Sequence, residues 1–363
     1  MYSKKEKVVV WLSTFKFITY KKFKSIIDNV DDIENLIDDV DRYKGVLSTI
    51  LKPDEVQELK AKSDLRLTES IIANYDKLNV CILTYFSHYY PETLKDIDTP
   101  PIILYCKGSL KLLSTPCLAV VGTRRATRYG KDITHDIVKE VAGSGITIVS
   151  GLADGIDTVA HSATLEVDGK TIAVIASGFN YIYPSSNMVL ADKILSNGGL
   201  ILSEYRMNEK PQSYNFPIRN RIIAGLSKAV VVAEATEKSG SMHTKNYALD
   251  YGREVFAIPG RISDIYSNGC NKLIKSGQAH MLLSSKDIIE LYGTELKCTK
   301  ENKVLQLSLE ESCVYELLKA GEMHYNELLT ATGLEPRKLN TLLMRLEING
   351  VVKKLPGNVY SVN

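Results

Sequence analysis

The chain has 363 residues, and its 45 Lys and Arg nearly balance 43 Asp and Glu, leaving a formal net charge of +2. This length predicts two or three domains, and the composition is typical of a soluble globular protein. No apolar run approaches the roughly 20 residues that span a bilayer, and the N-terminus shows no cleavable signal. We therefore expect a cytoplasmic protein.

The six cysteines and six histidines are scattered along the chain. Because no C-x-x-C pair and no H-E-x-x-H motif occurs, free thiols are favoured over structural zinc or a disulfide framework. We expect neither a metal site nor a cofactor.

Residues 1–75 are predicted to form a small helical domain, because apolar residues recur at steps of three and four. The predicted helices cover 8–12, 20–27, 33–40 and 53–75. Pro53 suits the first turn of the last helix. Such a bundle can serve either as a protein-contact module or as a stabilising cap.

The pattern changes over 76–292, where short Val- and Ile-rich runs alternate with helix-length segments. Such runs suit strands buried on both faces of a parallel sheet, and the alternation implies right-handed crossovers. The predicted strands cover 117–121, 146–150, 171–176, 200–203, 229–233, 255–258 and 281–283. The fold class is therefore α/β, a Rossmann-like, doubly wound, mostly parallel sheet, with 80–113 as an extended lead-in.

The C-terminal part is predicted to be a separate winged-helix domain over 309–363, after a polar linker over 293–308. The predicted helices and strands cover 309–320, 325–332, 336–349, 351–354 and 359–362. Three short helices followed by a hairpin are typical of a winged helix-turn-helix. Its charge is slightly negative, so contacts with protein are as plausible as DNA reading.

Glycine-broken turns close several of the predicted strands, at 120–124, 150–157 and 239–241, and a further turn covers 216–221. At the carboxyl end of a strand, unpaired N–H groups and the positive end of the following helix favour an anion. Turns of this kind along one sheet edge predict a row of phosphate sites, and therefore a polyanionic ligand.

The first two turns offer backbone and side-chain donors. Gly122 would let the backbone approach a phosphate, Thr123 adds a hydroxyl, and Arg124 adds a planar fork. A plain tight turn with a solvated Arg124 explains the motif equally well. The turn at 150–157 supplies a second set of phosphate-binding candidates, namely Ser150, Gly151 and Gly155.

Arg124 also belongs to a basic cluster with Arg125, Arg128 and Lys131. The net charge argues against a uniformly basic nucleic-acid-binding surface. A local groove lined by these residues can still bind phosphates.

Asp157 and His161 stand four positions apart, so on a helix they would share a face and could form a catalytic pair. A helix-capping Asp157 and a packed His161 are the favoured interpretation.

The turn at 216–221 is the more specific signal, because Phe216 offers a base-stacking face beside the phosphate forks of Arg219 and Arg221. Alternatively, Phe216 belongs to the core, and Arg221 pairs internally with Glu204 or Glu234. Internal pairing is a stronger alternative for Arg221 than for Arg219.

Two further phosphate-binding candidates follow from position. Ser239, Gly240 and Ser241 precede a predicted helix and offer backbone and hydroxyl donors. Lys170 precedes the strand at 171–176 and is a candidate cation, although a solvated loop lysine is the simpler explanation.

These motifs, in this order, resemble the DNA-processing protein A family (DprA, also called Smf). The matching motifs are V-G-T-R at 121–124, S-G-L-A-x-G-I-D-x-x-A-H at 150–161, G-K-T-I-A-V at 169–174, Y-P at 183–184, S-E-Y at 203–205, F-P-x-R-N-R-I-I-A-G-L at 216–226, S-G-S-x-x-T at 239–244 and G-R-x-V-F-A-I-P-G at 252–260. The resemblance is strong over about 80–290, and the SAM-like N-terminal domain and the winged helix agree in position.

The resemblance implies a Rossmann-like core that dimerises and binds single-stranded DNA without sequence preference. It also implies loading of the RecA recombinase onto incoming strands in natural transformation and recombination. By position, the residues facing the strand would be Gly122, Arg124, Ser150, Gly151, Phe216, Arg219, Asn220, Ser239 and Ser241. Asp154, His243, Lys245 and Gln278 depart from the family pattern, which puts the affinity and the local strand path in question.

An enzyme is the alternative, because related folds include nucleoside monophosphate phosphoribohydrolases. Those enzymes carry G-G-x-G-T-x-x-E, whereas the turn over 239–244 has no acid at the required offset. An NAD-dependent enzyme ranks last, since no G-x-G-x-x-G follows the first strand. We therefore expect a binding protein without catalytic residues.

Overall fold

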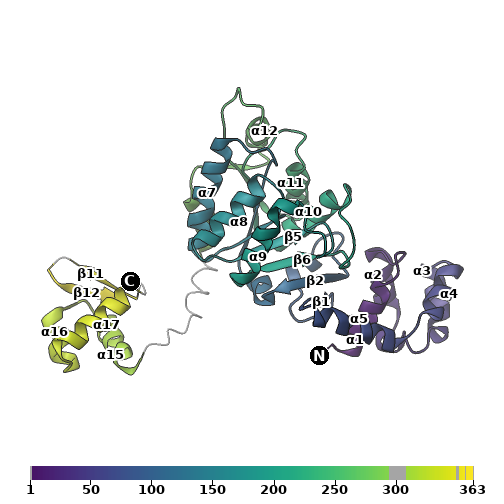
Figure 1. Ribbon diagram of the computed structural model, residues 1–363, viewed down its shortest axis with the longest axis horizontal. Coiled ribbons are helices and arrows are strands. Elements are labelled where there is room, and N and C mark those ends of the chain that lie inside the picture. Colours follow the sequence, from purple (N-terminus) through teal and green to yellow (C-terminus); the bar gives the residue numbers. More distant parts are fainter. Residues whose placement is uncertain (1, 294–307, 349–350, 356, 363) are drawn as a thin grey trace. The chain divides into compact units, whose positions relative to one another are not determined.

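The computed structural model describes residues 2–293, 308–348, 351–355 and 357–362 (Figure 1). The chain divides into two compact units, Met1–Leu296 and Lys297–Asn363. The predicted linker over 293–308 falls almost entirely outside the described residues. Within the described ranges, no helix combines the length and apolar character needed to cross a membrane.

A nine-stranded sheet with the order β1-β2-β6-β5-β4-β3-β7-β8-β9 forms the centre of the first unit. Its strands are β1 (Cys81–Thr84), β2 (Ile103–Gly108), β3 (Cys117–Val121), β4 (Thr147–Ser150), β5 (Thr171–Ile175), β6 (Leu200–Ser203), β7 (Ala229–Val232), β8 (Glu254–Ala257) and β9 (His280–Met281). All pairings from β6 to β9 are parallel. The predicted lead-in is an antiparallel pair, β1 and β2, joined to the edge of β6.

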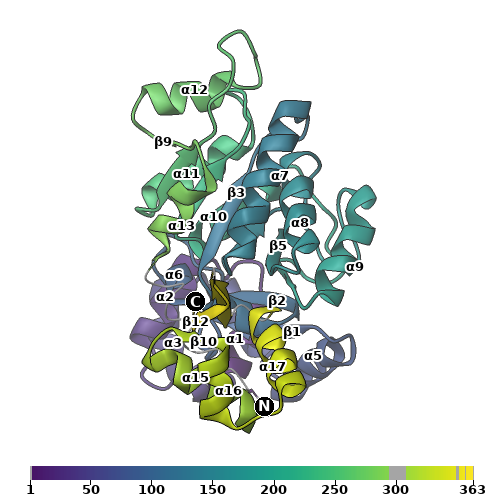
Figure 2. The same cartoon turned by 90° about the vertical axis from the view of Figure 1, so that its left-hand side faces the viewer.

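Helices cover both faces of the sheet, which confirms the doubly wound α/β prediction (Figure 2). The helices are α6 (Glu92–Lys95), α7 (Arg128–Gly143), α8 (Ile156–Glu166), α9 (Met188–Ser196), α10 (Asn215–Leu226), α11 (Ser241–Asp250), α12 (Asn268–Lys275) and α13 (Ser285–Leu291). Successive residues of β3 serve opposite faces. Leu118 packs in one apolar cluster with Val141 of α7, whereas Ala119 packs in another with Ile222 of α10.

The order of the strands places a topological reversal between β3 and β7. The chain runs outward from β3 through β4 and β5 to β6, and then returns to form β7 on the other side of β3. The connections that leave β3 and β7 therefore diverge at the carboxyl edge. Ligands of doubly wound sheets bind in the crevice that opens at this point.

The N-terminal helices differ in detail from the prediction. They are α1 (Lys4–Ser13), α2 (Tyr20–Asn29), α3 (Lys44–Ile50), α4 (Pro53–Ala61) and α5 (Leu65–Lys77). The single helix expected over 53–75 is two helices, because Asp64 caps the backbone N–H groups of Arg66 and Leu67 and starts α5 anew. The helix expected over 33–40 is only a short 3-10 turn, and α3 was not expected.

These helices pack directly on the first two strands. Trp11, Phe23 and Leu47 share one apolar cluster with Ile82 of β1 and Tyr105 of β2. The predicted boundary near residue 75 follows the change from helix to strand, but the apolar packing continues across it.

The second unit is the predicted winged helix. It contains α15 (Leu309–Ala320), α16 (Tyr325–Thr332) and α17 (Pro336–Ile348), with a small sheet of β10 (Met323–His324), β12 (Val359–Val362) and β11 (Val352–Leu355). Gly333 ends α16 at a φ of 65°, a left-handed conformation that glycine adopts without strain. The unit has its own apolar cluster, which includes Val314, Leu328, Leu343 and Tyr360.

Candidate functional site

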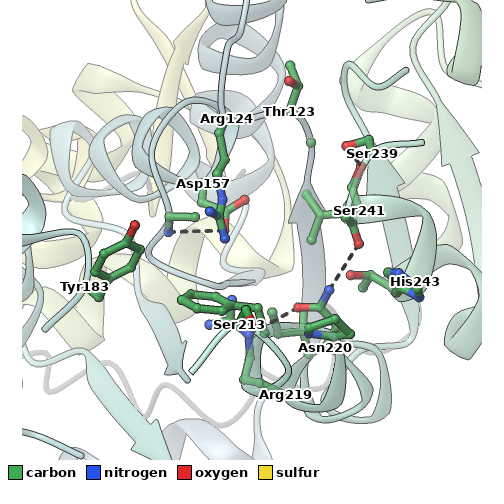
Figure 3. Close-up of a pocket in the computed structure, with 18 of the residues that line it drawn as sticks. Thr123, Arg124, Asp157, Tyr183, Ser213, Arg219, Asn220, Ser239, Ser241 and His243 are labelled. Atoms are coloured by element: carbon green, nitrogen blue, oxygen red, sulfur yellow. Dashed lines mark hydrogen bonds between the residues drawn. The ribbon is translucent and has the colours of Figure 1, made fainter. Parts of the chain in front are cut away.

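A pocket of about 720 Å³ opens at the carboxyl edge of the sheet, where β3 and β7 diverge (Figure 3). Its walls come from the connections after β3, β4, β5, β6 and β7 and from the first turns of α10. The pocket brings together nine of the residues predicted as ligand contacts: Gly122, Thr123, Arg124, Phe216, Arg219, Asn220, Ser239, Gly240 and Ser241.

The inner side of the turn after β3 packs against neighbouring parts of the protein. A Cβ at Gly122 would lie 2.4 Å from Ile156 Cγ1, so the glycine is required by the start of α8. Thr123 N–H donates to Glu234 O at 2.7 Å, and the Thr123 hydroxyl accepts from Arg125 N–H. The close approach predicted for Gly122 is therefore explained by packing against α8.

Arg124 leaves this turn and extends over the pocket. Its Cζ lies 4.9 Å from the centroid of the Phe216 ring, and Tyr183 contacts the same ring edge-on at 5.6 Å. Within the described residues, no carboxylate pairs with Arg124. The guanidinium donors therefore remain available to a ligand, and the Phe216 face that Arg124 covers is less available to a base than predicted.

Arg219 is buried, with 4 % of its surface exposed. Its Nη1 donates to Gly151 O at 2.8 Å and also to Val174 O, and its Nε donates to Asn220 Oδ1 at 3.2 Å. Burial lowers the pKa of Arg219 to about 10, against the opposing effect of Asp157. The predicted phosphate fork is thus largely committed to carbonyls at the ends of β4 and β5, and only Nη2 lacks a partner within the described residues.

Asp157 accepts from the N–H groups of Gly151 and Ala153 at 3.1 and 3.3 Å, and burial raises its pKa. It is not the helix N-cap, because α8 begins at Ile156 and Gly155 occupies the cap position. Asp157 instead closes the loop that follows β4.

His161 is fully buried, and its Nδ1 lies 2.7 Å from the Thr171 hydroxyl. Thr171 in turn donates to Ile148 O at 2.7 Å. The structure shows no hydrogen bond between His161 and Asp157, so the packed interpretation of His161 fits and the catalytic pair does not.

Three predicted contacts lie beneath the pocket and do not line it. The Ser150 hydroxyl donates to Val120 O at 2.7 Å, inside the sheet. Gly155 has a φ of 80°, and a Cβ there would lie 2.3 Å from Thr123 O. Gly151 is wedged against the Arg219 guanidinium. All three shape the pocket through the backbone.

The turn after β7 presents hydroxyl groups. Ser239 Oγ and Ser241 Oγ lie 2.9 Å apart, and Asn220 Nδ2 donates to Gly240 O at 3.3 Å. Figure 3 shows Arg124, Asn220 and Ser241 directed into one space. Thr244 also lines the pocket, and its buried hydroxyl has no partner within the described residues.

Two predicted cations are not at the site. Lys170 stands at the amino end of β5, at the opposite edge of the sheet, and its Nζ donates to Asn197 O at 2.6 Å. Arg221 is buried and pairs with both carboxylate oxygens of Glu204, at 2.5 and 2.7 Å. The internal pairing considered for Arg221 is therefore the one observed.

Sequence reasoning also missed residues that line the pocket. Tyr183 and Ser213 belong to its walls, as does Arg125, which was predicted only as part of a basic cluster. The Tyr183-Pro184 motif pointed to this position without indicating a role.

Family models match both units. The model of DNA recombination-mediator protein A matches residues 81–293, and the model of the DprA winged helix domain matches 300–358. The DNA processing protein DprA of Bacillus subtilis strain 168 is 42% identical over 250 residues, which cover 68% of this chain and 83% of that protein.

Two solved structures are also similar. The X-ray structure of DNA processing protein A from Streptococcus pneumoniae aligns over 80% of this chain and 98% of its own, with 34% identity and a TM-score of 0.62. DNA processing protein A from Helicobacter pylori, described as having a unique single-stranded DNA binding mode, aligns over 60% of this chain and 96% of its own. That alignment has 35% identity and a TM-score of 0.54.

Replacing Arg219 is expected to reduce stability, whereas replacing Arg124 is not. Arg219→Ala removes the hydrogen-bond donor of two buried carbonyls and the positive charge near the Asp157 carboxylate. The expected loss is about 2–4 kcal/mol in the free energy of unfolding. Arg124→Ala removes an exposed side chain and should leave that free energy within about 0.5 kcal/mol of the wild type. Urea denaturation followed by circular dichroism measures both, and equal midpoints for the two variants would contradict this assignment.

Stability is expected to fall on acidification because of His161. Burial and the nearby charge of Arg219 lower the pKa of His161 from 6.5 to about 3. The unfolded chain therefore binds one more proton than the folded chain between these values. The resulting stability is present above pH 6.5 and is lost as the pH falls toward 3. His161→Asn should remove this dependence while keeping a donor for Thr171.

His135→Asn is the matched control. Hydrogen bonds that the His135 imidazolium donates to the Asp136 and Glu166 carboxylates raise the pKa of His135, so its contribution is present at low pH and is lost as the pH rises. The two substitutions should change the slope of stability against pH in opposite directions. Denaturation midpoints at intervals between pH 4 and 8 measure the slopes, and unchanged slopes in His161→Asn would refute the role of the buried imidazole.

Proposed function

Because the chain belongs to the DNA recombination-mediator protein A family, we propose that it binds single-stranded DNA without sequence preference and without breaking bonds. The observation that carries the proposal is the unpaired Arg124 guanidinium at the mouth of a hydroxyl-rich pocket. In support, the similar protein from Helicobacter pylori is described by its single-stranded DNA binding mode.

Phosphates would be held by Arg124 and by the turn after β7. An arginine fork binds two phosphate oxygens, and Ser239 and Ser241 add hydroxyl donors beside the start of α11. These contacts address the sugar-phosphate backbone, which is the same for every sequence. Affinity should therefore depend on salt more than on base identity.

Bases would stack on the aromatic side of the pocket. Tyr183 is about half exposed, with 47 % of its surface accessible, and it packs edge-on against Phe216. Stacking tolerates any base, because every base has a π face. The aromatic pair thus adds affinity without adding sequence preference.

The environment of Asp157, which lines the pocket, supports the proposal that the protein breaks no bonds. Asp157 Oδ2 already accepts from two backbone N–H groups, and Asp157 is buried. A general acid or base must reach the proton that it transfers. If the protein released free base from nucleoside monophosphates, the phosphoribohydrolase alternative would replace this proposal.

We propose further that the protein acts as a homodimer and loads the RecA recombinase onto incoming strands in natural transformation, in the cytoplasm. The family description as a recombination mediator supports this role. A strand that threads two subunits gains effective concentration at the second site.

Arg124→Ala should weaken binding to oligothymidylate and oligodeoxycytidylate alike. Each lost phosphate contact on a single strand lowers the slope of log affinity against log salt by about 0.7. Fluorescence anisotropy over a salt series measures the slope. Arg66→Ala, which removes an exposed arginine from α5, is the matched control and should leave the slope unchanged. A salt-independent wild type would reject phosphate binding.

Light scattering should report a dimer both before and after addition of an oligonucleotide. A second site raises the effective concentration of the strand. Oligomers long enough to span two subunits should therefore have more than twice the affinity of oligomers that reach only one. A monomer under both conditions would reject the dimer while leaving strand binding intact.

A further inference from the structure

A second hollow lies on the same edge of the sheet, outside the pocket described above. It has a volume of about 660 Å³ and is lined by the start of α7 and by the turn after β8. Its residues are Thr127, Arg128, Tyr129, Pro259, Gly260, Arg261 and Asp264. We call it the α7 hollow. Figures 1 and 2 show the turn that leads into α12 beside one end of α7.

The walls of the α7 hollow are fixed by hydrogen bonds. Tyr129 Oη donates to Pro259 O at 2.8 Å, which joins the two walls. Thr127 donates from both N–H and hydroxyl to the Glu234 carboxylate, at 2.8 and 2.6 Å. Gly260 exchanges two hydrogen bonds with Asn271. The hollow is therefore formed before any ligand arrives, as small binding sites usually are.

The charge of the α7 hollow favours an anion. The Arg128 side chain is 95% exposed, and its contact with the exposed Asp132 is long, at 3.5 Å. Such exposed pairs contribute little, so Arg128 can exchange this partner for another. Arg261 is exposed as well. The acid in the lining, Asp264, accepts from Tyr266 N–H.

The α7 hollow also has an aromatic ring in its lining, that of Tyr129. Tyr129 is half exposed, and its hydroxyl is anchored to Pro259 O, so the ring is held in place. Arginine forks combined with a fixed, accessible ring are the groups that bind a single nucleic acid strand. A free phosphate would use the arginines and leave the ring without a partner.

The α7 hollow also continues from the first pocket. Arg124 and Arg125 line the first pocket, and the chain then passes directly into Thr127, Arg128 and Tyr129. Both sites lie at carboxyl ends of adjacent parallel strands, since β8 is the neighbour of β7. The two sites are thus neighbours along the chain and along the sheet edge, an arrangement that suits one extended ligand.

We propose that the α7 hollow binds the next nucleotides of the strand that fills the first pocket, with phosphates on Arg128 and Arg261 and a base on Tyr129. This proposal rests on the function proposed above and extends it, because it sets the length of strand that one subunit covers. A short oligomer would fill the first pocket alone, and only a longer one would reach Arg128 and Arg261.

A ladder of oligothymidylates from about 4 to about 16 nucleotides tests the proposal, a range that single-strand-binding sites cover. The double variant Arg128→Ala/Arg261→Ala should bind the shortest oligomers like the wild type. For the longest oligomers its salt slope should be lower by about 1.4, from two lost contacts. Arg42→Ala/Arg66→Ala removes two exposed arginines from the N-terminal helices and should match the wild type at every length.

The outcomes separate this proposal from the function on which it depends. If the wild type bound no oligomer of any length, the proposed function would fail. If short oligomers bound and the double variant kept wild-type slopes throughout, the α7 hollow alone would be rejected. A loss of equal size at all lengths, or in the control variant, would also reject it, because the arginines would then act through a general field.

Photocrosslinking gives a second readout that does not depend on affinity. An oligomer with a single 5-iodouracil, moved one position at a time, should crosslink to Tyr183 or Phe216 from one set of positions and to Tyr129 from another. Crosslinks confined to the first pocket at every position would overturn the proposal. The variant Tyr129→Ala should abolish only the second set.

Discussion

The pocket depends on one buried guanidinium. Arg219 donates from α10 to the carbonyls of Gly151 and Val174, at the ends of β4 and β5. A buried carbonyl without a donor costs about 1–3 kcal/mol. By bonding to both, Arg219 fixes the two turns relative to α10. Phe216 lies on the same helix and is thereby placed beside these turns, where Arg124 reaches its ring from the turn after β3.

The arginines of the two predicted phosphate-binding motifs thus divide into two chemical classes. Arg219 and Arg221 are buried and bonded to carbonyls and to Glu204, whereas Arg124 is exposed and has only an aromatic neighbour. A buried guanidinium directs most of its donors to groups of the protein, so it has few left for a ligand. The exposed one keeps nearly all of them. Arg219 and Arg221 therefore contribute to stability, whereas Arg124 keeps the donors that the proposed binding requires.

The sequence predicted the sheet well, because strands buried on both faces have a strong apolar signature, as β3 and β6 show. It predicted the site less well, since burial is not visible in a motif. Arg219 looks like a phosphate fork until its carbonyl partners are known, and Gly122 looks like a ligand contact until Ile156 is seen against it. The position of Lys170 was predictable, because a residue before a parallel strand lies at the amino edge.

Because the net charge is close to zero, attraction of a polyanion depends on the local arrangement of cations. A protein with a formal charge of +2 generates little long-range attraction for a polyanion, so affinity must come from short-range contacts. Cations that pair with carboxylates, such as Arg221, add nothing to that affinity. Among the residues that the structure describes, Arg124 has no such partner, and Arg128 has only a long, exposed one. Because both leave the carboxyl edge beside the same turn, the proposed strand would meet them in succession, and the length of that edge would determine how many phosphates are neutralised.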